Sequence, residues 1–206
     1  MKAVFAELPQ DVQEHRRRTG ADRWDEMWDG VLHMSPMPAP DHQEFEYQLQ
    51  TWLRRYWRKR CGGRVLQQVN LAPAGESEWT TNYRIPDLIL VSPDRLSGFQ
   101  ETHFAGAPLV AIEIRSPGDD SYEKLPFYAK LGTPEVWIIP NDSREIDLLM
   151  LSDGAYLNAV PNDDGWLTSP ATGVQFRHQP HCHLEIRLEA TPTDPMILPQ
   201  EDFDLA

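Results

Sequence analysis

The chain has 206 residues, of which 40% are hydrophobic, so it is long enough to bury one sizeable core. Its formal net charge of -13 argues against binding a polyanion through overall charge, and its two cysteines are too few for a disulfide framework. No apolar run approaches the roughly 18–20 residues that cross a bilayer, and the first residues lack the apolar core of a secretory signal. We therefore expect a soluble, cytoplasmic protein without membrane contact.

The first expected elements are a hairpin over residues 24–34 and a helix over residues 41–60. Asp29-Gly30 lies between two apolar runs, a pattern typical of a tight hairpin turn. In the helix, Asp41 is the expected N-cap, Glu44 completes a capping box, and Gly62-Gly63 ends the helix. Helical spacing predicts a core-facing stripe of Phe45, Leu49, Trp52, Leu53 and Tyr56.

The C-terminal end of this helix is strongly basic. The cations there are Arg54, Arg55, Arg58, Lys59, Arg60 and Arg64. One interpretation is a helix end whose positive charges complement the helix dipole. The other is a surface that follows the phosphates of a nucleic acid. Residues 64–71, which alternate in polarity, predict the next strand.

Two carboxylates interrupt the next two β-branched runs. Strand periodicity puts Asp87 on one face with Ile89, and Glu113 on one face with Ala111 and Arg115. A buried, unpaired carboxylate is costly, so such acids are usually paired, placed at a strand end or bound to a cation. If the two strands are neighbours, the acids converge. A divalent cation would relieve their repulsion, and oxygen ligands of this kind suit magnesium.

A helix that begins near residue 122 supplies a basic group. Its apolar members should face the sheet, so Lys124, on the same stripe, should point towards the end of the Glu113 strand. Two acids and a base around one point match a metal-dependent phosphodiesterase site. The structural alternative is an ordinary strand start at Asp87 and an ion pair between Glu113 and Arg115. The stripe consists of Lys124, Phe127, Tyr128 and Leu131.

Strands over residues 136–139, 146–151 and 156–160 complete the order α-β-β-β-α-β followed by a hairpin. The single helix between strands favours an α/β fold with a mixed β-sheet flanked by helices. We expect one domain over residues 1–206, with its core at about 24–160. Residues 1–23 are expected to form an N-terminal extension and residues 185–206 an acidic C-terminal tail.

Four stretches carry a family resemblance in their order and spacing. They are residues 24–36 with His42 beyond them, residues 85–88, residues 106–117 and residues 123–137. Together they resemble the Uma-two family of restriction endonucleases, within the PD-(D/E)XK nuclease superfamily. The resemblance implies a restriction-endonuclease-like fold and a magnesium-dependent, DNA-cleaving site, with Mn2+ as the alternative ion. Nucleases that cut both strands often work as dimers, so a homodimer is the assembly to test.

The resemblance also implies roles for single residues. Asp87 and Glu113 take the metal-ligand positions. Arg115 occupies the place of the superfamily's lysine, but an arginine stays protonated and cannot act as a base. The Uma-two pattern typically carries its lysine on the following helix instead, so the resemblance maps the lysine role onto Lys124, with Arg115 as a phosphate contact. This departure keeps a second interpretation open, in which the fold no longer cleaves and serves as a binding or assembly module. A third is a phosphodiesterase that acts on nucleotides.

Other polar residues have two interpretations each. His42 is either a residue that helps to position water near the metal or an exposed histidine in a first helical turn. Glu26 and Glu46 either add an acid to the site or are surface carboxylates. A cluster near the C-terminus suggests a zinc site through its imidazole and thiolate groups, or a polar strand edge. Its members are His178, His181, Cys182 and His183.

Overall fold

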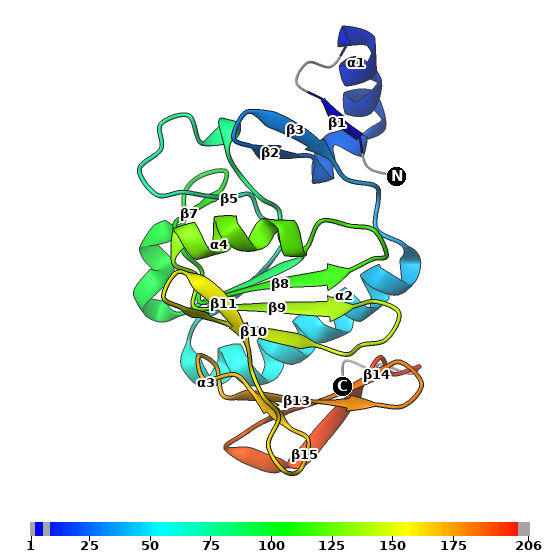
Figure 1. Ribbon diagram of the computed structural model, residues 1–206, viewed down its shortest axis with the longest axis vertical. Helices are drawn as coiled ribbons and strands as arrows, with labels where there is room; N and C mark the ends of the chain where they lie inside the picture. The colour runs from blue at the N-terminus through cyan, green and yellow to red at the C-terminus, as the bar shows by residue number, and fades with distance from the viewer. Residues whose placement is uncertain (1–2, 6–8, 202–206) are drawn as a thin grey trace.

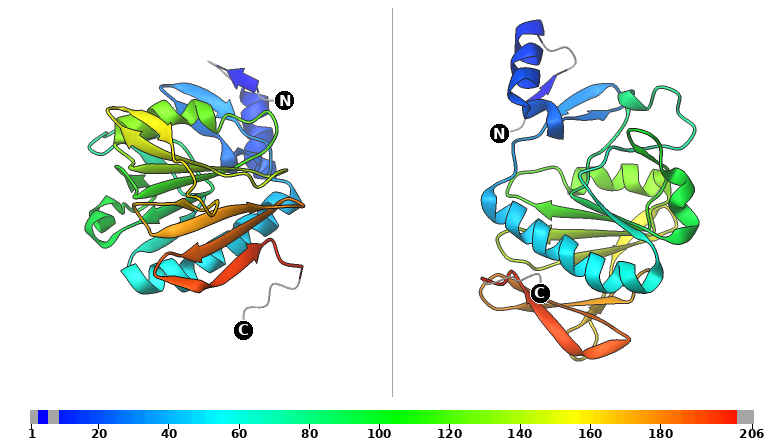
Figure 2. Two further views of the ribbon diagram at one scale, coloured as in Figure 1. Left: turned by 60° about the horizontal axis from the view of Figure 1, so that its bottom comes forward. Right: turned by 180° about the vertical axis from the view of Figure 1, so that it is seen from behind.

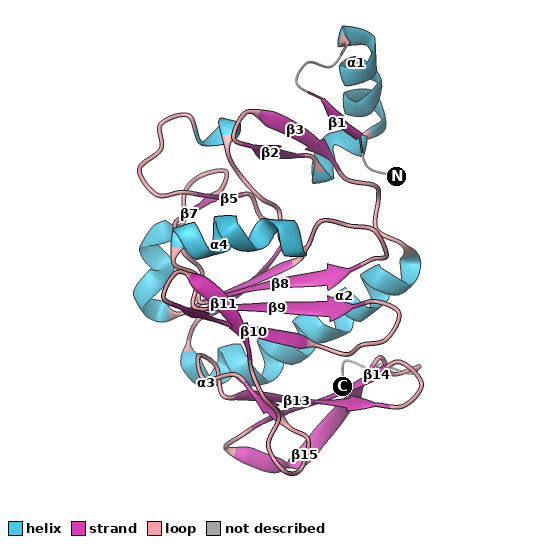
Figure 3. Cartoon of the chain, viewed as in Figure 1, coloured by secondary structure: helices cyan, strands magenta, loops and turns pink. Residues whose placement is uncertain are grey.

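A computed structural model describes residues 3–5 and 9–201 of the chain (Figure 1). Layers stack from top to bottom of Figure 1 as a small sheet, a helix, a six-stranded sheet, a second helix and a four-stranded sheet, and Figure 2 shows the same layers from behind. Helices pack against the strands of the sheets (Figure 3), and both contribute side chains to the core, which confirms the α/β class. None of the helices in the described part combines the length and apolar character that a membrane span requires.

The six-stranded sheet is mixed and has the order β11-β10-β9-β8-β6-β4. Strands β8 and β9 run parallel and are joined by a crossover that contains α4 (Leu125–Leu131), as the sequence pattern predicts. The other neighbours pair antiparallel. The strands are β4 (Arg64–Gln67), β6 (Leu88–Val91), β8 (Val110–Arg115), β9 (Glu135–Pro140), β10 (Asp147–Ser152) and β11 (Ala155–Asn158).

Each face of this sheet has its own core, because every central strand is apolar on both sides. Leu88 and Ile112 belong to the cluster on the α2 side. Ile89 and Ala111 belong to the cluster that contains Tyr128 of α4. A strand buried on both faces has a continuous apolar sequence, so a polar residue at such a strand is an exception that needs an explanation. Asp87 and Glu113 are two such exceptions.

The basic helix differs in two details from its prediction. It consists of α2 (Pro40–Trp52), the π-helical turn η2 (Leu53–Arg58) and α3 (Lys59–Cys61), and Gly62 ends it in the left-handed conformation as expected. Its N-cap is Ala39, without a side-chain cap, so the capping role of Asp41 was wrong. Tyr56 is 37% exposed and Trp57 is 3% exposed, because the wider turn of η2 shifts the buried position by one residue.

The predicted hairpin is present as β2 (Glu26–Trp28) and β3 (Val31–Met34), with Asp29 and Gly30 at positive φ in the turn. The expected extension contributes β1 (Ala3–Phe5), which pairs with β3, and α1 (Gln10–Thr19), which is followed by η1 (Ala21–Trp24). Helix α1 has no buried residue and projects from the body (Figure 1). Residues 1–2 and 6–8 of the extension lie outside the described part.

The predicted strand over residues 64–71 is broken. Gln68 has a φ of 48°, which ends β4, and its backbone N–H donates to the carbonyl of Asp87 at 2.9 Å. The chain then enters β5 (Leu71–Ala72), which pairs in parallel with β7 (Phe104–Ala105) in a separate ladder. The 3-10 turns η3 (Trp79–Thr81) and η4 (Pro93–Gly98) flank the Asp87 strand.

The expected acidic tail was wrong for residues 185–198, which lie in two strands of an antiparallel sheet and the turn between them; residues 202–206 lie outside the described part. Apolar side chains of this sheet, including Phe176, Ile186 and Leu198, join the core on the α2 side. The segment after the last strand of this sheet also contacts α2. The side-chain amide of Gln48 donates to the carbonyl of Gln200 and accepts from the N–H of Gln200. Its strands are β12 (Leu167–Thr168), β13 (Val174–Gln179), β14 (His183–Leu188) and β15 (Thr191–Leu198).

Candidate metal and phosphodiester site

A cleft of about 330 Å³ opens where the starts of α2 and of η5 (Tyr122–Lys124) meet the hairpin and the end of β8. In Figure 1 this region lies at the right, between the hairpin and the sheet. Asp87, Glu113 and Lys124 all line the cleft, together with the loop over residues 116–121. The structure thus brings together three of the four residues predicted to form the site.

Asp87 and Glu113 lie on neighbouring strands. The antiparallel register of β6 and β8 pairs Leu88 with Ile112, and one further step places Asp87 across from Glu113. Asp87 Oδ2 accepts the backbone N–H of Ile114 at 2.6 Å. Within the described residues, no hydrogen bond or ion pair involves Oδ1 of Asp87, which belongs to a residue that lines the cleft.

Glu113 belongs to a buried ionic cluster. Lys124 Nζ lies 3.0 Å from Glu113 Oε2 and 2.9 Å from Glu26 Oε1. The hydroxyl of Tyr128, one turn beyond Lys124, donates to Glu113 Oε1. Trp28 Nε1 donates to Glu26 Oε2 at 2.7 Å. Glu26, for which a surface position was the alternative, is only 2% exposed and is part of the cluster.

Acids outnumber bases in this cluster, and the pKa values reflect it. Burial raises the pKa of Glu113 to about 8; Lys124 opposes the shift, while Asp87 and Glu26 add to it. Burial lowers the pKa of Lys124, but the charges of Glu113 and Glu26 outweigh burial and raise it above its ordinary value. Lys124 therefore keeps its proton and acts as a cation.

A second cluster lies on the α2 side of Asp87. One ligand atom from each of His42, Glu46 and Asp87 lies within 4.8 Å of the others. His42 Nε2 is 3.4 Å from Asp87 Oδ2, and His42 Nδ1 is 3.9 Å from Glu46 Oε2. His42 is 5% exposed and Glu46 is fully buried, so the alternatives of an exposed histidine and a surface carboxylate were wrong.

The donor set of this region fits a hard divalent cation. Burial raises the pKa of Glu46 to about 7, and the charge of Asp87 raises it further, against His42 and two glutamine side chains. His42 Nδ1 is buried and makes no hydrogen bond to any described residue. Carboxylate oxygens with an excess of negative charge are the ligands that Mg2+ and Mn2+ prefer, and imidazole also serves Mn2+ as a nitrogen donor.

We expect the metal-free protein to lose stability as the pH rises from about 5 to about 8. The pKa of Glu46 rises from 4.5 in the unfolded chain to about 7 in the fold, so the folded state holds this proton more tightly. Ionising the group in the folded state therefore costs about 3 kcal/mol of stability. Thermal melts in EDTA measure this loss: Glu46→Gln should reduce the pH dependence, part of which comes from Glu113, and Glu14→Gln on exposed α1 should leave it unchanged.

Arg115, the fourth predicted site residue, does not line the cleft. Its guanidinium lies 5.3 Å from the ring of Tyr122 and its Nε 4.0 Å from Asp119 Oδ1, beside the loop that lines the cleft. The suspected zinc cluster does not converge either. His181 and Cys182 form an exposed turn between β13 and β14, and among the described residues the group at His42 meets the geometric requirement whereas this cluster does not.

Several supporting residues escaped sequence analysis. Tyr128 was assigned to the core by its stripe, but the spacing of four residues from Lys124 also places its hydroxyl beside Glu113. Arg84 lies between the rings of Trp28 and Phe127, at 4.3 and 4.2 Å from their centres, and supports the hairpin over α4. No local signal marks Arg84, because its partners come from distant segments.

Comparisons with known proteins bear on the family and the fold of the chain. The model of the Uma2 family, described as "Putative restriction endonuclease", matches residues 12–183. A solved structure of a "putative nuclease belonging to DUF820" from Anabaena variabilis ATCC 29413 is similar, with a TM-score of 0.57 and 18% sequence identity. The similarity covers 71% of this chain and 82% of that one, and at this identity it shows the fold. The comparison with curated proteins found no match.

Proposed function

Because the chain belongs to the Uma2 family, we propose that it is a metal-dependent endonuclease that hydrolyses phosphodiester bonds of DNA. The observation that carries this proposal is the convergence of Asp87, Glu113 and Lys124 on one cleft. An acid pair beside a fixed cation is the arrangement that a reaction at a phosphate group needs. The net charge of -13 makes a local, metal-assisted contact with the substrate necessary.

Asp87 and Glu113 are the residues that would hold Mg2+, with Mn2+ as the alternative. When bound, the ion neutralises phosphate charge and lowers the pKa of water. Asp87 is oriented for ligation by the Ile114 N–H and by His42, which leave Oδ1 uncommitted. Glu113 accepts one bond at each oxygen, and a carboxylate retains further acceptor sites after two such bonds.

Lys124 acts in this proposal as a hydrogen-bond donor and a positive charge. Its raised pKa keeps the ammonium protonated, so it stabilises the charge that develops on the phosphate and does not take a proton from water. Glu26 is a second ion-pair partner of Lys124, and the indole of Trp28 donates to Glu26. Arg115 is proposed as an outer phosphate contact, beside the loop that lines the cleft.

The test is the nicking of supercoiled plasmid by the pure protein in Mg2+, Mn2+ or EDTA, with an RNA substrate in parallel. We expect nicking of DNA in Mg2+ or Mn2+, none in EDTA, and a loss in Asp87→Asn. Equal nicking by the wild type and by Asp87→Asn would identify a contaminating nuclease and would remove the support for this site.

A second candidate is an inactive nuclease fold that serves as a binding module. It is favoured by the fact that both oxygens of Glu113 already have protein partners, Lys124 and Tyr128. This alternative predicts no cleavage and no change in melting temperature with Mg2+. A magnesium-dependent rise in melting temperature that Asp87→Asn abolishes would decide against it.

A further inference from the structure

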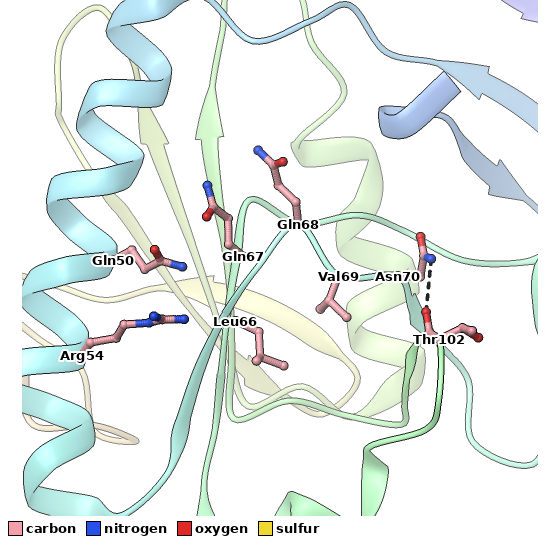
Figure 4. Close-up of a pocket in the computed structure, with 8 residues that line it drawn as sticks. All are labelled: Gln50, Arg54, Leu66, Gln67, Gln68, Val69, Asn70 and Thr102. Atoms are coloured by element: carbon pink, nitrogen blue, oxygen red, sulfur yellow. Dashed lines mark hydrogen bonds between the residues drawn. The ribbon is translucent and has the colours of Figure 1, made fainter. Parts of the chain in front are cut away.

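A second hollow of about 510 Å³, here called the glutamine groove, lies beside β4 (Figure 4). Gln50 and Arg54 extend into it from α2 and η2, Gln67 approaches from the end of β4, and Asn70 from the chain beyond it. The side chain of Asn70 closes the far end by donating to the carbonyl of Thr102 at 3.4 Å, the dashed line in Figure 4. The walls are therefore mainly polar and come from two separate elements.

The charge of the groove differs from that of the whole protein. The chain has 32 acidic residues and a net charge of -13, yet none of the described residues that line the groove is acidic. Arg54 supplies a positive charge there, and its guanidinium makes one hydrogen bond, to the carbonyl of Val65 at 3.3 Å. The exposed cations that follow Arg54 along the helix are Arg55, Arg58, Lys59 and Arg60. An anionic chain fits such a surface.

The amide groups of the groove provide donors and acceptors. Gln50 is only 9% exposed, and its amide makes no hydrogen bond within the described residues. Its polar atoms are not among the fully buried, unbonded atoms, so solvent in the groove reaches them. Gln67 is exposed on the opposite wall. Glutamine and asparagine amides can pair with base edges, especially those of adenine, through one donor and one acceptor.

The groove lies next to the metal site. Gln68 lines the groove, donates to Glu46 Oε2 at 3.2 Å and accepts from Trp24 Nε1 at 3.2 Å. Trp24 in turn lines the cleft that contains Asp87. One layer of side chains therefore separates the two hollows, so the groove adjoins the cleft that contains Asp87.

We propose that the glutamine groove binds the DNA strand next to the scissile phosphate, with Arg54 on a phosphate and the amides of Gln50 and Gln67 on bases. This inference rests on the proposed function, since it takes DNA as the substrate. This proposal gives the basic end of the helix a role in DNA binding, in addition to the favourable interaction of its positive charges with the helix dipole. It also assigns sequence preference to the two glutamines and affinity to the arginine.

Binding of Arg54→Ala to a fluorescent DNA duplex in EDTA tests the phosphate contact. We expect an affinity about tenfold weaker than that of the wild type. The slope of log affinity against log salt concentration should become shallower by about one, because one phosphate contact is lost. Arg17→Ala is the matched control, because it removes the same charge from exposed α1, far from α3 in Figures 1 and 2, and should change the affinity less than about twofold. Arg54→Lys keeps the charge and should keep most of the affinity.

Selection from a duplex library with random bases tests the base contacts. We expect Gln50→Ala and Gln67→Ala to relax the preference at one or two positions while affinity for mixed-sequence DNA stays within about threefold. If Arg54→Ala binds like Arg17→Ala while the wild type still cleaves DNA, the groove inference is wrong and the nuclease remains. If Arg54→Ala weakens binding in a protein that never cleaves, the groove stands and the proposed reaction fails.

Discussion

Replacing Lys124 by methionine is expected to lower the free energy of unfolding by about 3–5 kcal/mol. The side chain is largely buried between Glu26 and Glu113, at 2.9 and 3.0 Å from their oxygens. Methionine fills a similar volume but leaves two buried carboxylates without a cation. The cost comes from these unpaired acids rather than from a cavity. Urea unfolding of both proteins at pH 8 in EDTA measures the difference.

Two further variants identify the cause. Lys130→Met lies on the same helix with an exposed side chain and should change the free energy by less than about 0.5 kcal/mol. Adding Glu26→Gln and Glu113→Gln to Lys124→Met should recover much of the lost free energy of unfolding, because the triple variant no longer buries two unpaired carboxylates. A loss no larger than that of Lys130→Met would mean that the cluster contributes little to folding.

Glu113→Gln is expected to separate stability from activity. Glutamine keeps the shape and can bond both Lys124 and Tyr128, so the free energy of unfolding should change by no more than about 1 kcal/mol. It removes a proposed metal-ligand charge, which is worth several kcal/mol in a transition state. Since each 1.36 kcal/mol is a factor of ten in rate, DNA cleavage should fall by about a thousandfold or more.

The measurement pairs plasmid nicking rates with thermal melts of the same samples. Glu123→Gln is the control, because it makes the same chemical change on the exposed side of the turn that carries Lys124. Its nicking rate should match that of the wild type. A Glu113→Gln protein that remains folded and nicks DNA within tenfold of the wild type would remove Glu113 from the proposed site.

The approach of Asp87 to Glu113 was predictable because strand alternation is a local rule. Each acid interrupts an apolar run, and both occupy the same face of neighbouring strands. The direction of Lys124 follows in the same way from its helical stripe with Phe127 and Tyr128. These predictions need only the side-chain period of one element and the assumption that adjacent strands pair.

The burial of Glu26 and Glu46 was beyond local reasoning. Glu26 accepts a hydrogen bond from the Ile85 N–H, 59 residues away, and its ion pair with Lys124 joins still more distant segments. A carboxylate with no visible partner in its own segment is indistinguishable from a surface residue until the fold supplies one. The roles assigned to Asp87, Glu113, Arg115 and Lys124 remain predictions until they are tested.

The C-terminal sheet was missed for a different reason. Its inward residues do alternate, with Val174 and Phe176 on β13 and Leu184 and Ile186 on β14. The acidity of residues 185–206 favoured the interpretation of that segment as a tail, and no strand was predicted from residue 161 onward. Composition averaged over a long window concealed a short-period pattern, which is the stronger indication of a strand.

The π-helical turn η2 has a consequence for how this helix can vary. The turn holds one residue more than an α-helical turn, so Trp57 occupies the buried position that Tyr56 would take in a regular α-helix. Leu53, at the start of the turn, remains buried. A homologue shorter by the exposed Tyr56 would regain regular α geometry with the same two apolar anchors. This helix therefore contains a site at which evolution can add or delete a single amino acid without disturbing the interior.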